Sequence, residues 1–232
     1  MKYRQIAVAA AMALSASAAL AVPVTVVGST FDITYDNALV GLFGAPMITG
    51  NQVAWFPSGS PGFSASAISD VKITNSTFVL QLTAKPGYTL TGFSLLEGGD
   101  YKFYGSGSFV AAGGELRATP LTPGGPTLID DIDITSGAFL PQATSFPFPT
   151  RKWLAAATLA LPAGTTQANA TVENILFVYA ADVTPGDYAF IEKKDVFLTV
   201  MTAPIPEPET YALMLAGLGV VGFVALRRRK AR

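Results

Sequence analysis

The stretch that decides the fold is TFVLQLTA (residues 77–84), KPG (Lys85, Pro86 and Gly87) and YTLTGFSLL (residues 88–96). Both flanking runs are short and rich in β-branched and aromatic residues, with the alternating pattern of half-buried strands. The three residues between them carry the proline and glycine that are typical of a tight turn. The pattern therefore predicts two antiparallel strands joined as a β-hairpin.

Further runs of the same kind are separated by clusters of Gly, Pro, Asn and Ser. No stretch of this region shows helical amphipathicity, although WLAAATLAL (residues 153–161) could form a short helix on propensity alone. About ten closely spaced strands have no room for crossover helices, so we expect an all-β antiparallel β-sandwich, jelly-roll-like, over residues 22–203. The additional runs are residues 101–104, 108–112, 115–118, 127–135, 153–161, 171–181 and 195–201.

The composition separates two apolar ends from an acidic middle. Half of the 232 residues are hydrophobic and 13% are charged, and residues 6–21 and 211–226 contain no charged side chain. The middle carries 8 basic and 14 acidic side chains, a net charge of −6. A domain of that sign repels phosphate backbones, so nucleic acid is excluded as a partner.

The chain contains neither cysteine nor histidine. This inventory excludes disulfides, thiol nucleophiles, Cys/His zinc sites, histidine-based triads and haem held by a proximal histidine. We expect no cofactor.

The first 21 residues have the three parts of a secretory signal peptide: a basic start, an apolar stretch, and small residues around Leu20. Cleavage is expected between Ala21 and Val22. The alternative, an N-terminal helix of the folded domain, lacks the polar face that such a helix shows to solvent. The secretion machinery and signal peptidase are therefore expected partners.

The last segment reads PIPEPETYALMLAGLGVVGFVALRRRKAR (residues 204–232). As a helix, its apolar run at residues 211–226 is about 24 Å long, slightly short of a hydrocarbon core of about 30 Å. Interfacial and basic flanking side chains cover the difference. The predicted C-terminal transmembrane helix is followed by basic residues that keep this end cytoplasmic, namely Arg227, Arg228, Arg229 and Lys230.

Pro206, Glu207 and Pro208, the apolar span and the arginine cluster together resemble the PEP-CTERM sorting signal of Gram-negative, exopolysaccharide-producing bacteria. The resemblance implies that exosortase, a membrane-embedded transpeptidase-like cysteine protease, cuts near the motif. An inner-membrane precursor would then give a protein of the cell surface or extracellular matrix. The two prolines hold the segment extended, which suits either a protease substrate or a stiff linker.

Asp130, Asp131 and Asp133 form the densest acidic cluster. On one extended strand Asp131 and Asp133 would share a face, and carboxylate oxygens suit Ca²⁺. The favoured alternative is a solvated strand face, because these acids alternate with Ile132 and Ile134.

A glycoside hydrolase would need two paired carboxyl groups. The sequence gives no means of pairing its acids, so we expect no enzymatic activity. The other acids expected mostly at turns are Glu97, Asp100, Glu115, Glu173, Asp182, Asp187 and Glu192.

Aromatic side chains are the groups that a sugar-binding sandwich would use, with core packing as the alternative. The candidate glycan contacts are Trp55, Tyr101, Tyr104, Trp153 and Tyr188. We expect a non-enzymatic surface or matrix protein associated with exopolysaccharide and biofilm, with a carbohydrate-binding module as the alternative. Ice binding is discounted, because no repeat generates a regular array of threonines.

Overall fold

The computed structural model describes residues 23–57, 62–105, 107–136, 139, 150–181, 187–206 and 212–221. Strands dominate these residues, with one 3-10 turn, η1 (Asn37–Leu39), and a helical segment at residues 212–221. The strands are β1 (Pro23–Val27), β2 (Phe31–Asp36), β3 (Met47–Thr49), β4 (Gln52–Trp55), β5 (Ser64–Ala67), β6 (Val71–Ala84), β7 (Tyr88–Tyr104), β8 (Phe109–Thr122), β9 (Leu128–Asp131), β10 (Asp133–Ser136), β11 (Arg151–Ala160), β12 (Gln167–Tyr179) and β13 (Tyr188–Pro204).

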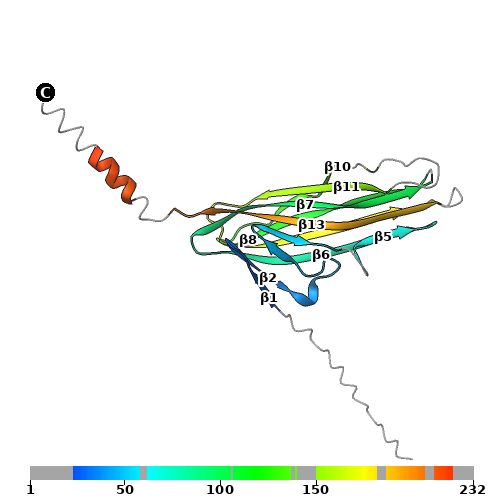
Figure 1. The fold of residues 1–232 in the computed structure, drawn as a ribbon, viewed down its shortest axis with the longest axis horizontal. Coiled ribbons are helices and arrows are strands. Elements are labelled where there is room, and N and C mark those ends of the chain that lie inside the picture. Colours follow the sequence, from blue (N-terminus) through cyan, green and yellow to red (C-terminus); the bar gives the residue numbers. More distant parts are fainter. Residues whose placement is uncertain are drawn as a thin grey trace, which may run out of the picture.

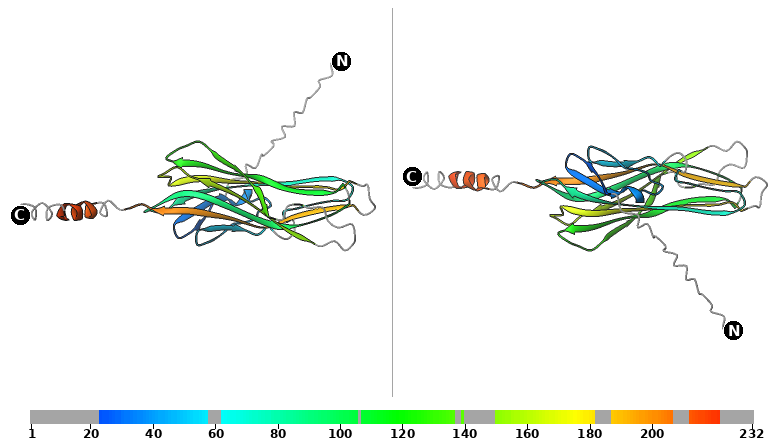
Figure 2. Two further views of the ribbon diagram at one scale, coloured as in Figure 1. Left: turned by 90° about the horizontal axis from the view of Figure 1, so that it is seen from above. Right: turned by 90° about the horizontal axis from the view of Figure 1, so that it is seen from below.

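The strands form two antiparallel sheets that lie face to face (Figures 1 and 2). Sheet A has the order β1-β2-β6-β12-β8-β9, and sheet B has the order β10-β11-β7-β13-β4-β3, with β5 also paired to β13. Successive long strands from β6 to β8, and again from β11 to β13, alternate between the sheets. The expected all-β antiparallel sandwich is confirmed.

The predicted hairpin at residues 77–96 is correct in its strands and its turn but wrong in its pairing. The Tyr88 N–H donates to the Lys85 carbonyl across the turn at 3.0 Å, and Gly87 has a φ of +86°. However, β6 pairs with β2 and β12 in sheet A, whereas β7 pairs with β11 and β13 in sheet B. The connection therefore crosses from one sheet to the other.

Burial explains why these two strands face each other instead of pairing. Leu80 and Leu82 of β6, and Phe93 and Leu95 of β7, are all almost fully buried in one hydrophobic core. Strands that each cover one side of a core lie in opposite sheets, where their apolar faces interdigitate.

The apolar run at residues 153–161 falls almost entirely in strand β11 and is not a helix. Its side chains alternate between core and solvent, with Trp153, Ala155 and Ala157 buried. The buried side chains recur every two residues, as they do in a strand that packs on a core. This packing outweighs the helical propensity of alanine.

The two ends of the chain fall largely outside the described residues. Strand β1 begins at Pro23, so the expected cleavage at Ala21 and Val22 precedes the described part. Of the expected span at 211–226, residues 212–221 are described as a helix with exposed side chains. In the described part of the chain, no helix combines the length and the apolar character that crossing a membrane requires. The basic residues Arg227, Arg228, Arg229 and Lys230 also lie outside it.

Candidate functional site

The sorting segment leaves the sandwich at one end of β13. Pro204 pairs with Tyr88, and the Ile205 N–H donates to the Gly87 carbonyl at 2.7 Å. The next residue, Pro206, is exposed. The fold therefore holds the chain up to Ile205 and presents the start of the motif to solvent; Glu207 and Pro208 lie outside the described residues.

Three of the five aromatic residues expected to contact glycan are core residues. Trp55, Tyr101 and Trp153 are each 1% exposed. Trp55 packs edge-on against Phe78 with ring centroids 5.2 Å apart, and Trp153 Nε1 donates to the Glu192 carbonyl at 3.2 Å. Their rings therefore face the interior of the sandwich, which corrects the expectation that they contact sugar.

The other two, Tyr104 and Tyr188, lie opposite each other on β7 and β13 and are half-buried. Lys102 Nζ lies 5.6 Å from the centroid of the Tyr188 ring. Burial raises the pKa of the Tyr188 phenol above its ordinary value. The structure thus brings these two residues together, with an ammonium group near one of the rings.

A second group of aromatic side chains, which the sequence reasoning missed, lies on the outer face of sheet A. The Phe109 ring centroid is 5.2 Å from that of Phe177 and 5.6 Å from that of Tyr179. Val71 and Ile73, paired with Tyr179 and Phe177 respectively, extend the apolar surface. We call these five residues the distal aromatic patch. Phe109 is 46% exposed and Ile73 is 61% exposed, so the patch is open to solvent.

The patch lies at the end of the sandwich opposite the sorting segment. Val71 begins β6, whereas Ala84 ends it next to the turn that holds Ile205. A strand of 14 residues at about 3.3 Å per residue separates the two ends by about 40 Å. A protein held by its C-terminal segment therefore carries this patch far from the point of attachment.

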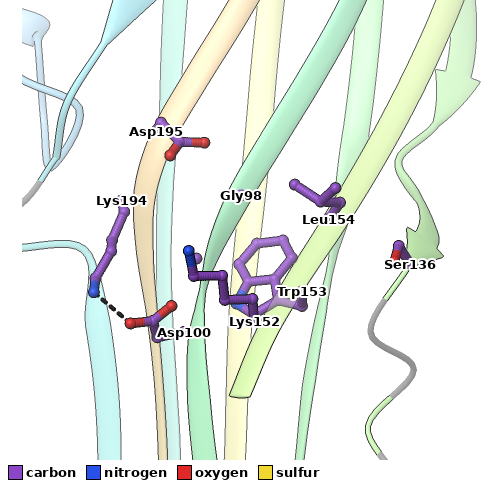
Figure 3. Close-up of a pocket in the computed structure, with 9 residues that line it drawn as sticks. Gly98, Asp100, Ser136, Lys152, Trp153, Leu154, Lys194 and Asp195 are labelled. Carbon is purple, nitrogen blue, oxygen red and sulfur yellow. Dashed lines mark hydrogen bonds and ion pairs between the residues drawn. The ribbon is translucent and has the colours of Figure 1, made fainter. Parts of the chain in front are cut away.

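A groove of about 300 Å³ lies on the outer face of sheet B (Figure 3). Its floor is Gly98, where a Cβ atom would lie 2.6 Å from Asp195 Oδ1. The β13 register shifts beside it, between Lys193 and Asp195. Glycine and bulge together open the sheet surface here.

Charged side chains surround this groove. Lys194 Nζ contacts the Asp100 carboxylate and lies 3.2 Å from Glu192 Oε1. Its hydrogen bonds, first with Asp100 and then with Glu192, raise the pKa of Lys194. Lys152 and Asp195 also line the groove. The groove therefore presents charged side chains of both signs, which can form hydrogen bonds with the hydroxyl groups of a ligand.

The expectation that the acids lie mostly at turns is wrong for five of them, which lie within strands. Arg117 Nη2 is 2.6 Å from Glu115 Oε2 and 3.1 Å from Glu173 Oε2 on sheet A. Ion pairs along one strand and between neighbouring strands therefore account for these positions. The five are Glu97, Asp100, Glu115, Glu173 and Glu192; Asp187 directly precedes β13, and Asp182 lies outside the described residues.

Asp130, Asp131 and Asp133 do not share one strand. Asp131 ends β9 in sheet A and Asp133 begins β10 in sheet B, with the buried Ile132 at the crossing. Asp130 Oδ2 accepts a hydrogen bond of 2.6 Å from the Thr158 N–H. Among the described residues, no group of three or more acids is placed to hold a metal ion.

The core contains a cluster of three polar side chains whose burial the sequence reasoning did not predict. Glu97 and Lys193 are each 1% exposed, and Asn174 is fully buried. Each occupies an inward position on its strand, in phase with apolar neighbours such as Leu95 and Ile191. A polar residue at an inward position of an alternating strand pattern is the signal in the sequence that could have identified these three residues.

Comparison with known proteins bears on the C-terminal segment. Residues 204–230 match the family model described as the PEP-CTERM protein-sorting motif. None of the curated proteins compared matches this chain. The C-terminal segment therefore carries a PEP-CTERM sorting motif, which implies export, processing by exosortase and sorting to the cell surface.

Proposed function

We propose that this protein is a non-enzymatic β-sandwich of the cell surface or biofilm matrix that contacts exopolysaccharide through the distal aromatic patch. The observation that carries the proposal is the placement of the patch at the end of the sandwich opposite the sorting segment. A display protein is attached at one end and makes contacts with the other.

The proposed route begins with cleavage between Ala21 and Val22. Residues 211–226 then hold the precursor in the inner membrane as a transmembrane helix, with the basic residues after them in the cytoplasm. Exosortase acts at residues 206–208, frees the jelly-roll-like domain from the membrane helix and leaves it displayed at the surface by its C-terminal end. The exposed Pro206 beside the last pairing of β13 supports this order, because the first residue of the motif is accessible while the domain is folded.

Aromatic rings contribute to glycan affinity by covering the apolar faces of sugar rings. The distal aromatic patch supplies three rings, with the ring centroids of Phe177 and Tyr179 lying 5.2 and 5.6 Å from that of Phe109, and aliphatic side chains flank them. Exposed apolar clusters of this kind mark interaction surfaces on soluble domains.

The non-enzymatic role is supported by the partners of the acidic side chains. Glu97 is inaccessible to any substrate at 1% exposure, and Asp100 at the groove is ion-paired with Lys194. A hydrolase needs two substrate-facing carboxyl groups with distinct roles.

A carbohydrate-binding module that uses the sheet B groove is the second candidate. The groove combines Lys152, Asp195 and an ion pair over the glycine floor, which favours hydrogen bonding to hydroxyl groups. This candidate differs from the first in the face of the sandwich that contacts sugar.

The two candidates are separated by co-sedimentation of the purified full-length chain with exopolysaccharide from the producing bacterium. We expect a double variant, Phe109→Ala with Phe177→Ala, to weaken binding by about tenfold. Val79→Ala is the matched control, because Val79 is 51% exposed on the same strand as the patch but nearer the tail. Loss of binding in Lys152→Ala with Asp195→Asn, but not in the patch variant, would favour the groove. Absence of binding by the parent protein would contradict both.

A further inference from the structure

The three buried polar side chains connect the two sheets. Glu97 on β7 and Lys193 on β13 belong to neighbouring strands of sheet B, while Asn174 on β12 belongs to sheet A. Lys193 Nζ donates to Asn174 Oδ1 at 2.6 Å, and Asn174 Nδ2 donates to Glu97 Oε1 at 2.7 Å. Lys193 Nζ also contacts Glu97 Oε2. Each side chain therefore touches both of the others.

The surroundings of this cluster are apolar. Lys193 Nζ lies 5.2 Å from the Trp153 ring centroid and 5.7 Å from that of Phe63, and both rings belong to buried residues. Burial lowers the pKa of the Lys193 amine, while the Glu97 carboxylate opposes that shift. A lysine in such a site loses its proton more easily than one in water, and a neutral amine is a nucleophile.

We propose that Lys193 and Asn174 form an intramolecular isopeptide bond between the two sheets, with Glu97 as the catalytic acid and base. The amine and the carboxamide are already in contact. Asn174 Cγ lies one carbonyl bond, about 1.23 Å, from Oδ1. The contact of 2.6 Å therefore places Nζ within about 3.8 Å of Cγ, close to the separation of about 3–3.5 Å at which bound groups react.

The reaction needs no other reactant. Glu97 takes a proton from the Lys193 ammonium, and the neutral Nζ attacks Asn174 Cγ to form the new C–N bond. Glu97 polarises the carboxamide and passes a proton to Nδ2, so that the Cγ–Nδ2 bond breaks and ammonia leaves. The second proton that Nζ loses is taken up by the departing ammonia, which leaves as ammonium and carries away the positive charge of the lysine. No atom changes oxidation state, and Glu97 ends as it began. The apolar walls exclude the water that would hydrolyse the amide instead.

The position of the bond suits an attached protein. Lys193 lies on β13, the strand that leads directly to the sorting segment. A pull on that segment acts on β13, and a covalent link to β12 transmits the force to sheet A. The chain has no cysteine with which to make a disulfide.

A Glu-specific protease gives a direct test on the purified full-length chain. Cleavage after Glu173, Glu192 and Glu209 places Asn174 in peptide 174–192 and Lys193 in peptide 193–209, because the bond between Glu207 and Pro208 resists the protease. We expect mass spectrometry to find the two as one species, lighter than their sum by about 17 Da, the mass of ammonia. Two separate peptides of unmodified mass from the parent protein would overturn the proposal.

Variants test the assigned roles with the same readout. We expect Glu97→Gln to leave the peptides separate, because glutamine cannot exchange the protons; a linked pair in this variant would overturn the role of Glu97. Lys194→Arg is the matched control, since it changes the neighbouring ammonium and is expected to keep the link. The parent protein alone decides whether the bond exists, so the proposal does not depend on the folding of any variant.

Discussion

Lys193 and Lys194 are consecutive residues of β13 that occupy opposite environments. The side chain of Lys193 is 1% exposed and contacts Glu97 in the core, whereas that of Lys194 is 44% exposed and contacts Asp100 outside the sheet. Two ion pairs of the same chemical type therefore lie on opposite faces of one sheet. Loss of one partner lowers the free energy of unfolding much more for the buried pair than for the exposed one.

We expect Lys193→Met to lower the free energy of unfolding by at least about 3 kcal/mol, because it leaves the Glu97 carboxylate buried without its partner and removes the proposed bond. Lys194→Met is expected to cost less than about 1 kcal/mol, since its pair is solvent-exposed. Urea denaturation of the full-length chain in detergent, followed by near-ultraviolet circular dichroism, measures both. Equal losses in the two variants would contradict the assignment of Lys193 to the core.

Gly99 of β7 is expected to be intolerant of any side chain. A Cβ atom there would lie 1.9 Å from the Glu192 carbonyl oxygen and 2.8 Å from Trp153 Nε1. Gly99→Ala is therefore expected to cost at least about 2 kcal/mol by forcing β7 and β13 apart.

The control for this substitution is Gly113 of β8, where a Cβ atom would meet nothing within 4 Å. Gly113→Ala is expected to be neutral or to stabilise by about 0.4–1 kcal/mol, because alanine restricts the unfolded chain. Thermal unfolding of both variants provides the comparison, and a neutral Gly99→Ala is the result that would count against the described packing.

The sequence predicted the strands better than it predicted their partners. Alternation at residues 77–96 defines which residues are inward on β6 and β7, and the turn at Gly87 follows from the proline and glycine beside it. Pairing depends on which faces meet across the core, and a hairpin and a sheet-to-sheet crossing have the same local signals.

The candidate site was less predictable for the same reason. Trp55 and Trp153 are aromatic residues that core packing and sugar binding use equally, so only their burial separates the two roles. Phe177 and Tyr179 belong to a continuous apolar run, ILFVY at residues 175–179. Without polar residues in alternate positions, the run does not show which of its side chains face outward. The sorting motif was predictable because it depends on residue order in a short segment and not on tertiary contacts.

Calcium is expected to leave the thermal stability unchanged. Asp131 and Asp133 lie in different sheets on either side of Ile132, and Asp130 already accepts a hydrogen bond from the Thr158 N–H. A ligand that binds only the folded state at a hundred times its Kd adds about 2.7 kcal/mol. Differential scanning fluorimetry is therefore expected to give the same Tm with millimolar calcium, with magnesium as the control and with chelator. A rise specific to calcium would restore the cation-site interpretation.

Replacement of Pro206 and Pro208 by alanine is expected to keep the protein in the membrane fraction at precursor mass in cells that express exosortase. Alanine permits helical or collapsed conformations that proline disfavours, so the segment after Ile205 would no longer be held extended for a protease. Pro86→Ala is the matched control, because Pro86 lies in the turn beside the same exit but outside the matched residues. Fractionation and intact-mass analysis give the readout. If the double variant still reaches the surface with the parent mass, recognition does not depend on the prolines, and the extended conformation of the motif is not what exosortase reads.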